Sequence, residues 1–302
     1  MRIETGMNSS FLYLNDLRVH YQRWEAAERD CPVVLLHGLS SSARIWELVA
    51  PHLAEKGLTC YAPDARGHGF SDQPEDSAEN YGFSSLTSDL AAFLETCQLE
   101  RPLLVGHSWG GMLALDYAAG LRIGARAPRG IVLVDGGITQ MDDRNGETWE
   151  SISKRMEPPR LEGMTVEAFL RMIRKETAAW HPDEAVFPIL LADFEVNDQE
   201  QIRPRLTYER HMRIVRAIWD FKTYTRFSQV RCPVLMVPAR PPAPRSVFEQ
   251  NWVAARERGV ALAQESIQNL QVAWMEDTIH DIPLQRPAEL AKLIADFAAG
   301  LE

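Results

Sequence analysis

The chain has 302 residues, of which 45% are hydrophobic and 25% charged, and its net charge is −10. This composition excludes collagen-like and low-complexity proteins, and the length suits one large α/β domain or a core domain with an insertion. Because an acidic protein repels phosphate backbones, we expect no nucleic-acid partner.

The first half of the chain alternates short apolar runs with segments of helical periodicity. We predict strands and helices as follows: strands at 32–36, 58–62, 102–105 and 130–134, and helices at 44–56, 83–97 and 110–121. The strand runs are apolar at consecutive positions, which is typical of a parallel sheet covered by helices on both faces.

This alternation stops in the middle of the chain. No strand-like run occurs from about 137 to 228, where we predict helices at 165–180, 183–194 and 206–221. Strands resume at 234–237 and 271–275, and a helix at 287–299 follows. The pattern predicts a doubly wound α/β core formed by residues 1–136 and 229–302, interrupted by a helical insertion at 137–228.

Signals for membranes, export and metals are weak. No apolar run reaches the length of a membrane span, and residues 1–10 lack the basic start and apolar stretch of a signal peptide. The four cysteines form no CxxC pair, so we expect neither a disulfide framework nor a metal site. We therefore expect a cytoplasmic protein, and the oligomeric state stays open.

The most specific motif is Gly106-His107-Ser108-Trp109-Gly110, between a predicted strand and a predicted helix. This G-x-S-x-G pattern and its context are typical of a nucleophile elbow, a turn so tight that it needs glycines beside the serine. The turn would raise the Ser108 hydroxyl above the sheet, where the following helix N-terminus favours negative charge. We predict that Ser108 is the nucleophile.

A second motif, His37-Gly38-Leu39, follows the predicted strand at 32–36. Acyl transfer needs two N–H donors for the oxyanion, and we assign them to the backbone amides of Leu39 and Trp109. Gly38 lets this loop approach the reacting atoms, and we expect His37 to hold the loop rather than act as the base.

His280 is the predicted general base. It lies just past the predicted strand at 271–275, and a loop at that end of a late strand reaches the same rim of the sheet as Ser108. The other histidines fall in scaffold elements, in the motifs above or in the insertion.

Taken together, these motifs resemble those of the α/β-hydrolase superfamily. They read HGLSSS at 37–42, DARGHGFSD at 64–72, GHSWGG at 106–111 and HDIPLQRP at 280–287, in family order and across the whole core. The resemblance implies a Ser–acid–His triad, a helical cap at the insertion and no cofactor. It also implies that the loop at 64–72 is structural.

The triad acid departs from the commonest family pattern. Many relatives carry an aspartate shortly after the strand equivalent to 234–237, but residues 238–245 contain no carboxylate, and Glu249 is the first to follow. The resemblance also allows the acid after the preceding strand, as in haloalkane dehalogenases, and that position here is Asp135. The order Ser108, Asp135, His280 is then the expected one. Asp135, Glu249 and no working acid stay open, with Asp135 preferred.

The predicted function is hydrolysis of a small, mostly apolar carboxylic ester or related acyl bond through a Ser-His-Asp triad and an acyl-enzyme. The partner is thus a small-molecule ester or acyl substrate. Family members that act on haloalkanes or epoxides need aspartate at the elbow, so Ser108 favours acyl chemistry. The same triad would also support C–C bond hydrolysis, lactone opening or perhydrolysis. The alternative outside the enzymes is a ligand-binding or signalling protein without catalytic activity, and it is motivated by the lack of a carboxylate at 238–245.

The insertion is expected to cover the site and select the substrate. We predict that the substrate pocket includes the following residues: His37, Gly38, Trp109, Ile138, Trp180 and Trp219.

Overall fold

The computed structural model describes residues 7–27, 31–120, 127–143, 147–243 and 246–301. Within them, the strands of the main sheet are β1 (Met7–Leu14), β2 (Leu17–Trp24), β3 (Val33–Leu36), β4 (Cys60–Pro63), β5 (Leu103–His107), β6 (Gly130–Val134), β9 (Val234–Val237) and β11 (Leu270–Val272). Their spatial order is β1-β2-β4-β3-β5-β6-β9-β11. Strand β2 is antiparallel to β1 and β4, and the other pairs are parallel.

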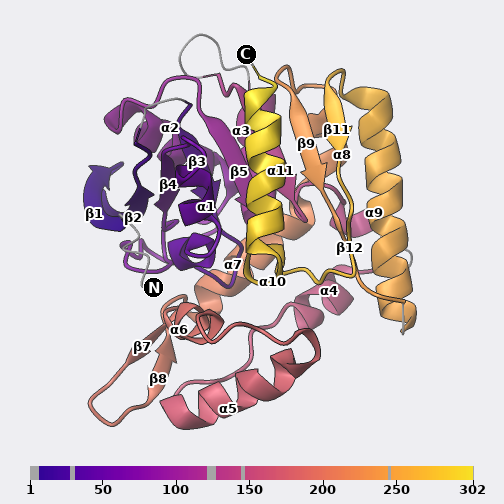
Figure 1. The fold of residues 1–302 in the computed structure, drawn as a ribbon. Coiled ribbons are helices and arrows are strands. Elements are labelled where there is room, and N and C mark those ends of the chain that lie inside the picture. The colour runs from indigo at the N-terminus through magenta and orange to yellow at the C-terminus, as the bar shows by residue number, and fades with distance from the viewer. Residues whose placement is uncertain (1–6, 28–30, 121–126, 144–146, 244–245, 302) are drawn as a thin grey trace.

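Helices cover both faces of this sheet (Figure 1). One layer contains α1 (Ala50–Ala54), α10 (Ile282–Gln285) and α11 (Pro287–Ala299), and the other contains α2 (Phe83–Thr96), α3 (Trp109–Ala119), α8 (Thr223–Phe227) and α9 (Val247–Ser266). In β6, Ile131 and Leu133 enter one hydrophobic core while Val132 and Val134 enter the other. Because both faces are buried, the strand is apolar at every position, and the predicted doubly wound α/β fold is confirmed.

Between β6 and α8, the chain forms α4 (Trp149–Arg155), α5 (Val166–Thr177), α6 (Val186–Leu191), β7 (Phe194–Val196), β8 (Ile202–Pro204) and α7 (Tyr208–Asp220). These elements lie beyond the carboxyl ends of the parallel strands (Figure 1). The antiparallel hairpin of β7 and β8 corrects our expectation of a strand-free insertion. Strands of three residues are too short to show a period-two pattern, so no signal for them is visible in the sequence.

Three further boundaries differ from the prediction. The helix expected at 44–56 is a 3-10 turn at Ala43–Trp46 followed by the short helix α1. The two do not form one continuous helix because Pro51, in the first turn of α1, has no N–H to donate to the preceding turn. The helix expected at 183–194 ends at Leu191, where the chain enters the hairpin. The strand expected at 271–275 is split into β11 and β12 (Met275–Glu276), because β12 pairs with a different strand, β10 (Ala239–Arg240). Residue 121, the expected end of the third helix, lies outside the described residues.

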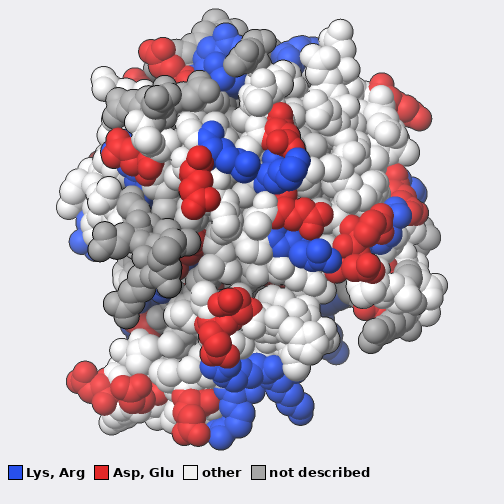
Figure 2. Space-filling model, in the orientation of Figure 1, with Lys and Arg blue, Asp and Glu red and all other residues white. Residues whose placement is uncertain are grey.

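In the described part of the chain, none of the helices has the length and apolar character needed to cross a bilayer. On the face drawn in Figure 2, lysine and arginine side chains mostly lie beside aspartate and glutamate side chains.

Candidate active site

Ser108 occupies the turn between β5 and α3 with φ +55° and ψ −118°, a backbone conformation that is strained for a residue with a side chain. The glycines around it make the turn possible. A Cβ on Gly106 would lie 2.1 Å from the carbonyl oxygen of Gly110, and a Cβ on Gly110 would lie 2.3 Å from that of Leu36. The predicted elbow is therefore present, and it holds Ser108 at the carboxyl edge of the sheet.

His280 and Asp135 meet Ser108 at this edge. The Nε2 atom of His280 lies 2.9 Å from Ser108 Oγ, and its Nδ1 atom lies 2.5 Å from Asp135 Oδ2. We assign the tautomer in which Nδ1–H donates to the carboxylate and the serine hydroxyl donates to Nε2, since only this one suits both contacts. The structure thus brings together three predicted residues that are far apart in the sequence.

The Asp135 carboxylate is fully buried and has three further hydrogen bonds. Its Oδ1 accepts from the backbone N–H of Ala239 at 3.0 Å and from Arg256 Nε at 2.6 Å, and its Oδ2 accepts from Arg256 Nη2 at 2.6 Å. Burial by itself would raise the pKa of Asp135, but the charge of Arg256 and the hydrogen bond to His280 outweigh it and hold the pKa well below its usual value. Asp135 is therefore ionised at neutral pH.

Glu249, the alternative acid, lies in the first turn of α9. Its Oε2 accepts from both the N–H and the hydroxyl of Ser246 at 2.8 Å, which forms a capping box at the start of the helix. These contacts give Glu249 a role in starting the helix, and they are separate from the contacts of His280.

The His37 ring holds the loop after β3 in place through two hydrogen bonds to the backbone. Its Nδ1–H donates to the Gly38 carbonyl at 2.7 Å, and its Nε2 accepts from the Ala65 N–H at 3.0 Å. Burial is the main cause that lowers the pKa of His37 to about 4, so the ring is neutral and can play both roles. This is the holding role expected for His37.

Asp64 ties the same loop to the one at 64–72. Its carboxylate accepts from the backbone N–H of Ala43 at 2.7 Å and of Phe70 at 2.9 Å, and it contacts His20. This agrees with the structural role that we expected for residues 64–72.

A cavity of about 270 Å³ opens above the triad. Leu39 and Trp109 line it together with Ser108, and Trp109 is the first residue of α3, so its amide has no acceptor within the helix. The remaining wall is mainly apolar and includes Met112, Ile138, Met141, Met156, Ile218, Phe248 and Trp252. Such a cavity suits a small, mostly apolar group next to the hydroxyl.

Our prediction of the pocket residues is correct only in part. Trp109 and Ile138 line the cavity, and Gly38 adjoins it, since a Cβ there would lie 3.3 Å from Ser108 Cβ. His37, Trp180 and Trp219 do not line it. The His37 ring is hydrogen-bonded to the backbone of the loop after β3. Trp180 packs against the core on the α11 side of the sheet. Trp219 of α7 pairs with Trp149 of α4.

One wall of the cavity is formed by α9, and none of its residues is among the predicted pocket residues. Phe248, Trp252 and Arg256 are spaced four residues apart, so they lie along one face of this helix. This spacing was visible in the sequence, but its meaning depends on where α9 packs.

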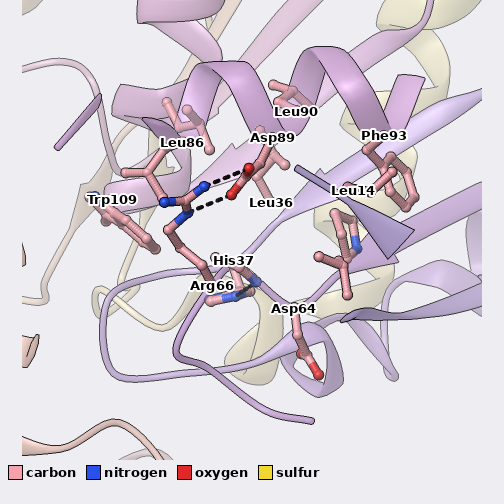
Figure 3. A pocket seen from close by; sticks show the side chains of 14 residues that line it. Leu14, Leu36, His37, Asp64, Arg66, Leu86, Asp89, Leu90, Phe93 and Trp109 are labelled. Atoms are coloured by element: carbon pink, nitrogen blue, oxygen red, sulfur yellow. Dashed lines mark hydrogen bonds and ion pairs between the residues drawn. The ribbon is translucent and has the colours of Figure 1, made fainter. Parts of the chain in front are cut away.

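A second, smaller cavity of about 40 Å³ lies behind Trp109, within the core between α2 and the sheet (Figure 3). Its wall is mainly apolar, with side chains such as Leu36, Leu90 and Phe93, and it also contains the ion pair between Arg66 Nε and Asp89 Oδ2 at 2.6 Å. Trp109 lines both cavities and separates them.

Among the described residues, no group of three or more His, Cys, Asp or Glu side chains could hold a metal ion.

Residues 33–293 match the family model described as "Alpha/beta hydrolase family". Epoxide hydrolase A of Mycobacterium tuberculosis is 42% identical over 90 residues, which are 30% of this chain and 28% of the relative. A haloalkane dehalogenase of Mesorhizobium japonicum is 34% identical over 132 residues, 43% of this chain and 38% of the relative. These alignments therefore span less than half of each relative.

The solved structure of E-2-(acetamidomethylene)succinate hydrolase is similar over nearly the full length of both chains. The TM-score is 0.75 at 18% identity, and the match covers 97% of this chain and 99% of that one. At this identity the similarity concerns the fold.

Proposed function

The chain belongs to the α/β hydrolase family, and on that basis we propose that it is a serine hydrolase that cleaves a small, mostly apolar carboxylic ester or related acyl compound. The observation that carries the proposal is the series of contacts from Ser108 Oγ through His280 to Asp135, at 2.9 and 2.5 Å. This is the arrangement in which a serine hydroxyl becomes nucleophilic.

In the proposed mechanism, Ser108 Oγ attacks the acyl carbon while His280 Nε2 takes the hydroxyl proton. Asp135 accepts from Nδ1–H throughout and stabilises the imidazolium that forms. The backbone amides of Leu39 and Trp109 bind the oxyanion, and loss of one such donor typically costs about 3 kcal/mol of transition-state stabilisation. His280 then protonates the leaving alcohol, and a water molecule, activated by the same imidazole, hydrolyses the acyl-enzyme.

The identity of the nucleophile separates this proposal from the activities named for two relatives. Epoxide hydrolase A and the haloalkane dehalogenase align with part of this chain, but here the elbow carries Ser108. A serine alkoxide attacking an acyl carbon leaves an ester that water can cleave, so acyl substrates fit this residue best.

We propose residues 137–228 as the insertion that forms the cap and residues 1–136 and 229–302 as the core, with the last helix of the insertion, α8, packed in the helix layer on the sheet. Met156, which follows α4, and Ile218 on α7 contribute cap side chains to the cavity above Ser108. Substrate selection by apolar size follows from this placement, because one methylene more or less in such a pocket changes discrimination by about 1–3 kcal/mol.

The non-catalytic alternative was motivated by the missing carboxylate after Val237. Asp135 stands in hydrogen-bond contact with His280, which supports a working triad and removes that motive.

Labelling with a fluorophosphonate and turnover of a panel of aryl esters of increasing acyl length test the proposal. Wild type is expected to label with one equivalent and to hydrolyse the short esters, and Ser108→Ala is expected to do neither. Ser84→Ala, an exposed serine in the first turn of α2, is the control and should behave as wild type. Full labelling and turnover by Ser108→Ala would overturn the assignment, and a wild type that neither labels nor turns over any ester would overturn the proposed function.

A further inference from the structure

Arg256 is the most unusual neighbour of the proposed triad. Its guanidinium group contacts both oxygens of Asp135, through Nε and Nη2 at 2.6 Å each, and its side chain is only 5% exposed. The group also lies over the ring of Trp252, and its Nη1 donates to the Trp252 carbonyl at 3.3 Å. A bidentate pair held this way leaves the carboxylate little freedom to rotate.

These contacts come from the part of the chain after β9, where residues 238–245 contain no carboxylate that could serve as the triad acid. After β9, the chain gives Asp135 the backbone N–H of Ala239, and α9 then gives it Arg256. The region where many relatives carry the carboxylate thus provides the donors that hold a carboxylate placed one strand earlier. Arg256 thereby orients Oδ2, which accepts from His280 Nδ1.

Arg256 Nη2 and His280 Nδ1 contact the same oxygen atom, Asp135 Oδ2. The position of this oxygen relative to the imidazole is therefore set by the guanidinium group as well as by the hydrogen bond from His280.

Other ionisable groups face His280 from the elements around it. His107, at the end of β5, donates from Nε2 to the His280 carbonyl at 2.9 Å, and burial is the main cause that lowers the pKa of His107 to about 4, so it is neutral. Asp281 follows in the chain, and Arg155 of α4 lines the same cavity, where it pairs with Glu147. Arg256 differs from all of these because it is buried and bound to the proposed triad acid itself.

We infer that Arg256 is a positioning residue of the triad, which holds both oxygens of Asp135 and thereby fixes the carboxylate toward His280. The inference rests on the proposed function. It deepens that proposal, because it assigns a fourth residue to the same site.

The test compares wild type with Arg256→Met, Arg256→Gln and Arg256→Lys. The measurements are kcat and KM for a short aryl ester and the NMR resonance of the His280 Nδ1–H proton in the resting protein. We expect the Met and Gln variants to lower kcat by about 100-fold with KM little changed, and to shift or broaden this resonance, because the carboxylate is then free to rotate away from Nδ1–H. We expect Lys, which keeps the charge but cannot form the bidentate pair, to give a kcat between those of wild type and the other variants.

Arg226→Met is the matched control, since Arg226 forms an Arg–Asp pair with Asp116 at 2.7 Å between α8 and α3. It should lower stability without changing kcat or the Nδ1–H resonance. A wild-type kcat and an unchanged resonance in both the Met and Gln variants would overturn the inference. If Arg256→Met does not fold, Arg256→Gln decides, because it can keep one hydrogen bond to Asp135. The NMR measurement needs no turnover, so failure of the proposed function stays distinguishable from failure of this inference.

Discussion

Asp193 lies between α6 and β7, and the surroundings of its carboxyl group favour the protonated form over the charged form. The residue is partly exposed, but its Oδ1 atom is buried and has no hydrogen-bond partner among the described residues. Burial is the main cause that raises the pKa of Asp193 to about 8, and Asp64 adds to it, while Ser42, Arg44 and Arg205 oppose it.

This pKa makes stability depend on pH with a defined sign. The folded protein keeps a proton on Asp193 up to about pH 8, whereas the unfolded chain releases it near the ordinary aspartate pKa of 3.8. Stability therefore falls as the pH rises between these two values, because the unfolded state gains a charge that the folded state resists. Asp193→Asn imitates the neutral carboxyl and should remove this loss.

The expected size follows from the shift. About four pH units at about 1.36 kcal/mol each set an upper limit of about 5 kcal/mol, and the partial exposure of the residue reduces it to about 3 kcal/mol. We expect Asp193→Asn to gain most of this stability relative to wild type at about pH 8 and little at about pH 5.

The assay is urea unfolding at several pH values, with Asp198→Asn as the control. Asp198 is exposed in the turn of the β7–β8 hairpin, so its variant should follow wild type at every pH. A difference between Asp193→Asn and wild type that is the same at both ends of the pH range would refute the reasoning.

Three further outcomes can be measured directly. Asp135→Asn is expected to lower kcat by about 10⁴, as loss of a triad acid does. Glu249→Gln should lower the free energy of unfolding by only about 1 kcal/mol and leave kcat unchanged. Equal effects of the two variants on kcat would show that the acid was assigned wrongly. Gly110→Ala places a Cβ 2.3 Å from a main-chain carbonyl of β3, so we expect at least about 2 kcal/mol of lost stability together with a large loss of labelling, and unchanged labelling would contradict the elbow geometry. Val19→Ile adds a methylene next to the cavity behind Trp109 and should raise the free energy of unfolding by up to about 0.8 kcal/mol, while Val33→Ile in the opposite, filled core should lower it. The reverse order would mean that the cavity cannot accept the group.

Several parts of the site could be predicted from local sequence. The elbow is one of them, because a serine between two glycines, after an apolar strand and before an apolar helix, has few conformations available. His280 was found by its place after a late strand. Both depend on residues that are neighbours in the chain and on the rule that parallel strands end at one edge of the sheet. Asp135 was preferred because the family resemblance allows the acid after the strand that became β6, and Glu249 stayed an alternative.

Other parts could not be predicted this way. Trp180 and Trp219 are aromatic residues of the cap, but nothing local says whether an aromatic side chain packs within the cap or faces a cavity. The β7–β8 hairpin was missed because its strands are shorter than the window in which periodicity is visible.

The sequence by itself therefore determined the alternation of strands and helices in most of the core, the tight turn at Ser108 and the chemical types available at the sheet edge, since these depend on short-range sterics and on hydrophobic periodicity. Only the tertiary structure decided which carboxylate meets His280 and that Arg256, 121 residues further along, holds it from a different helix. Contacts of this kind depend on how helices pack across the sheet, and packing is set by the whole core at once rather than by any local pattern.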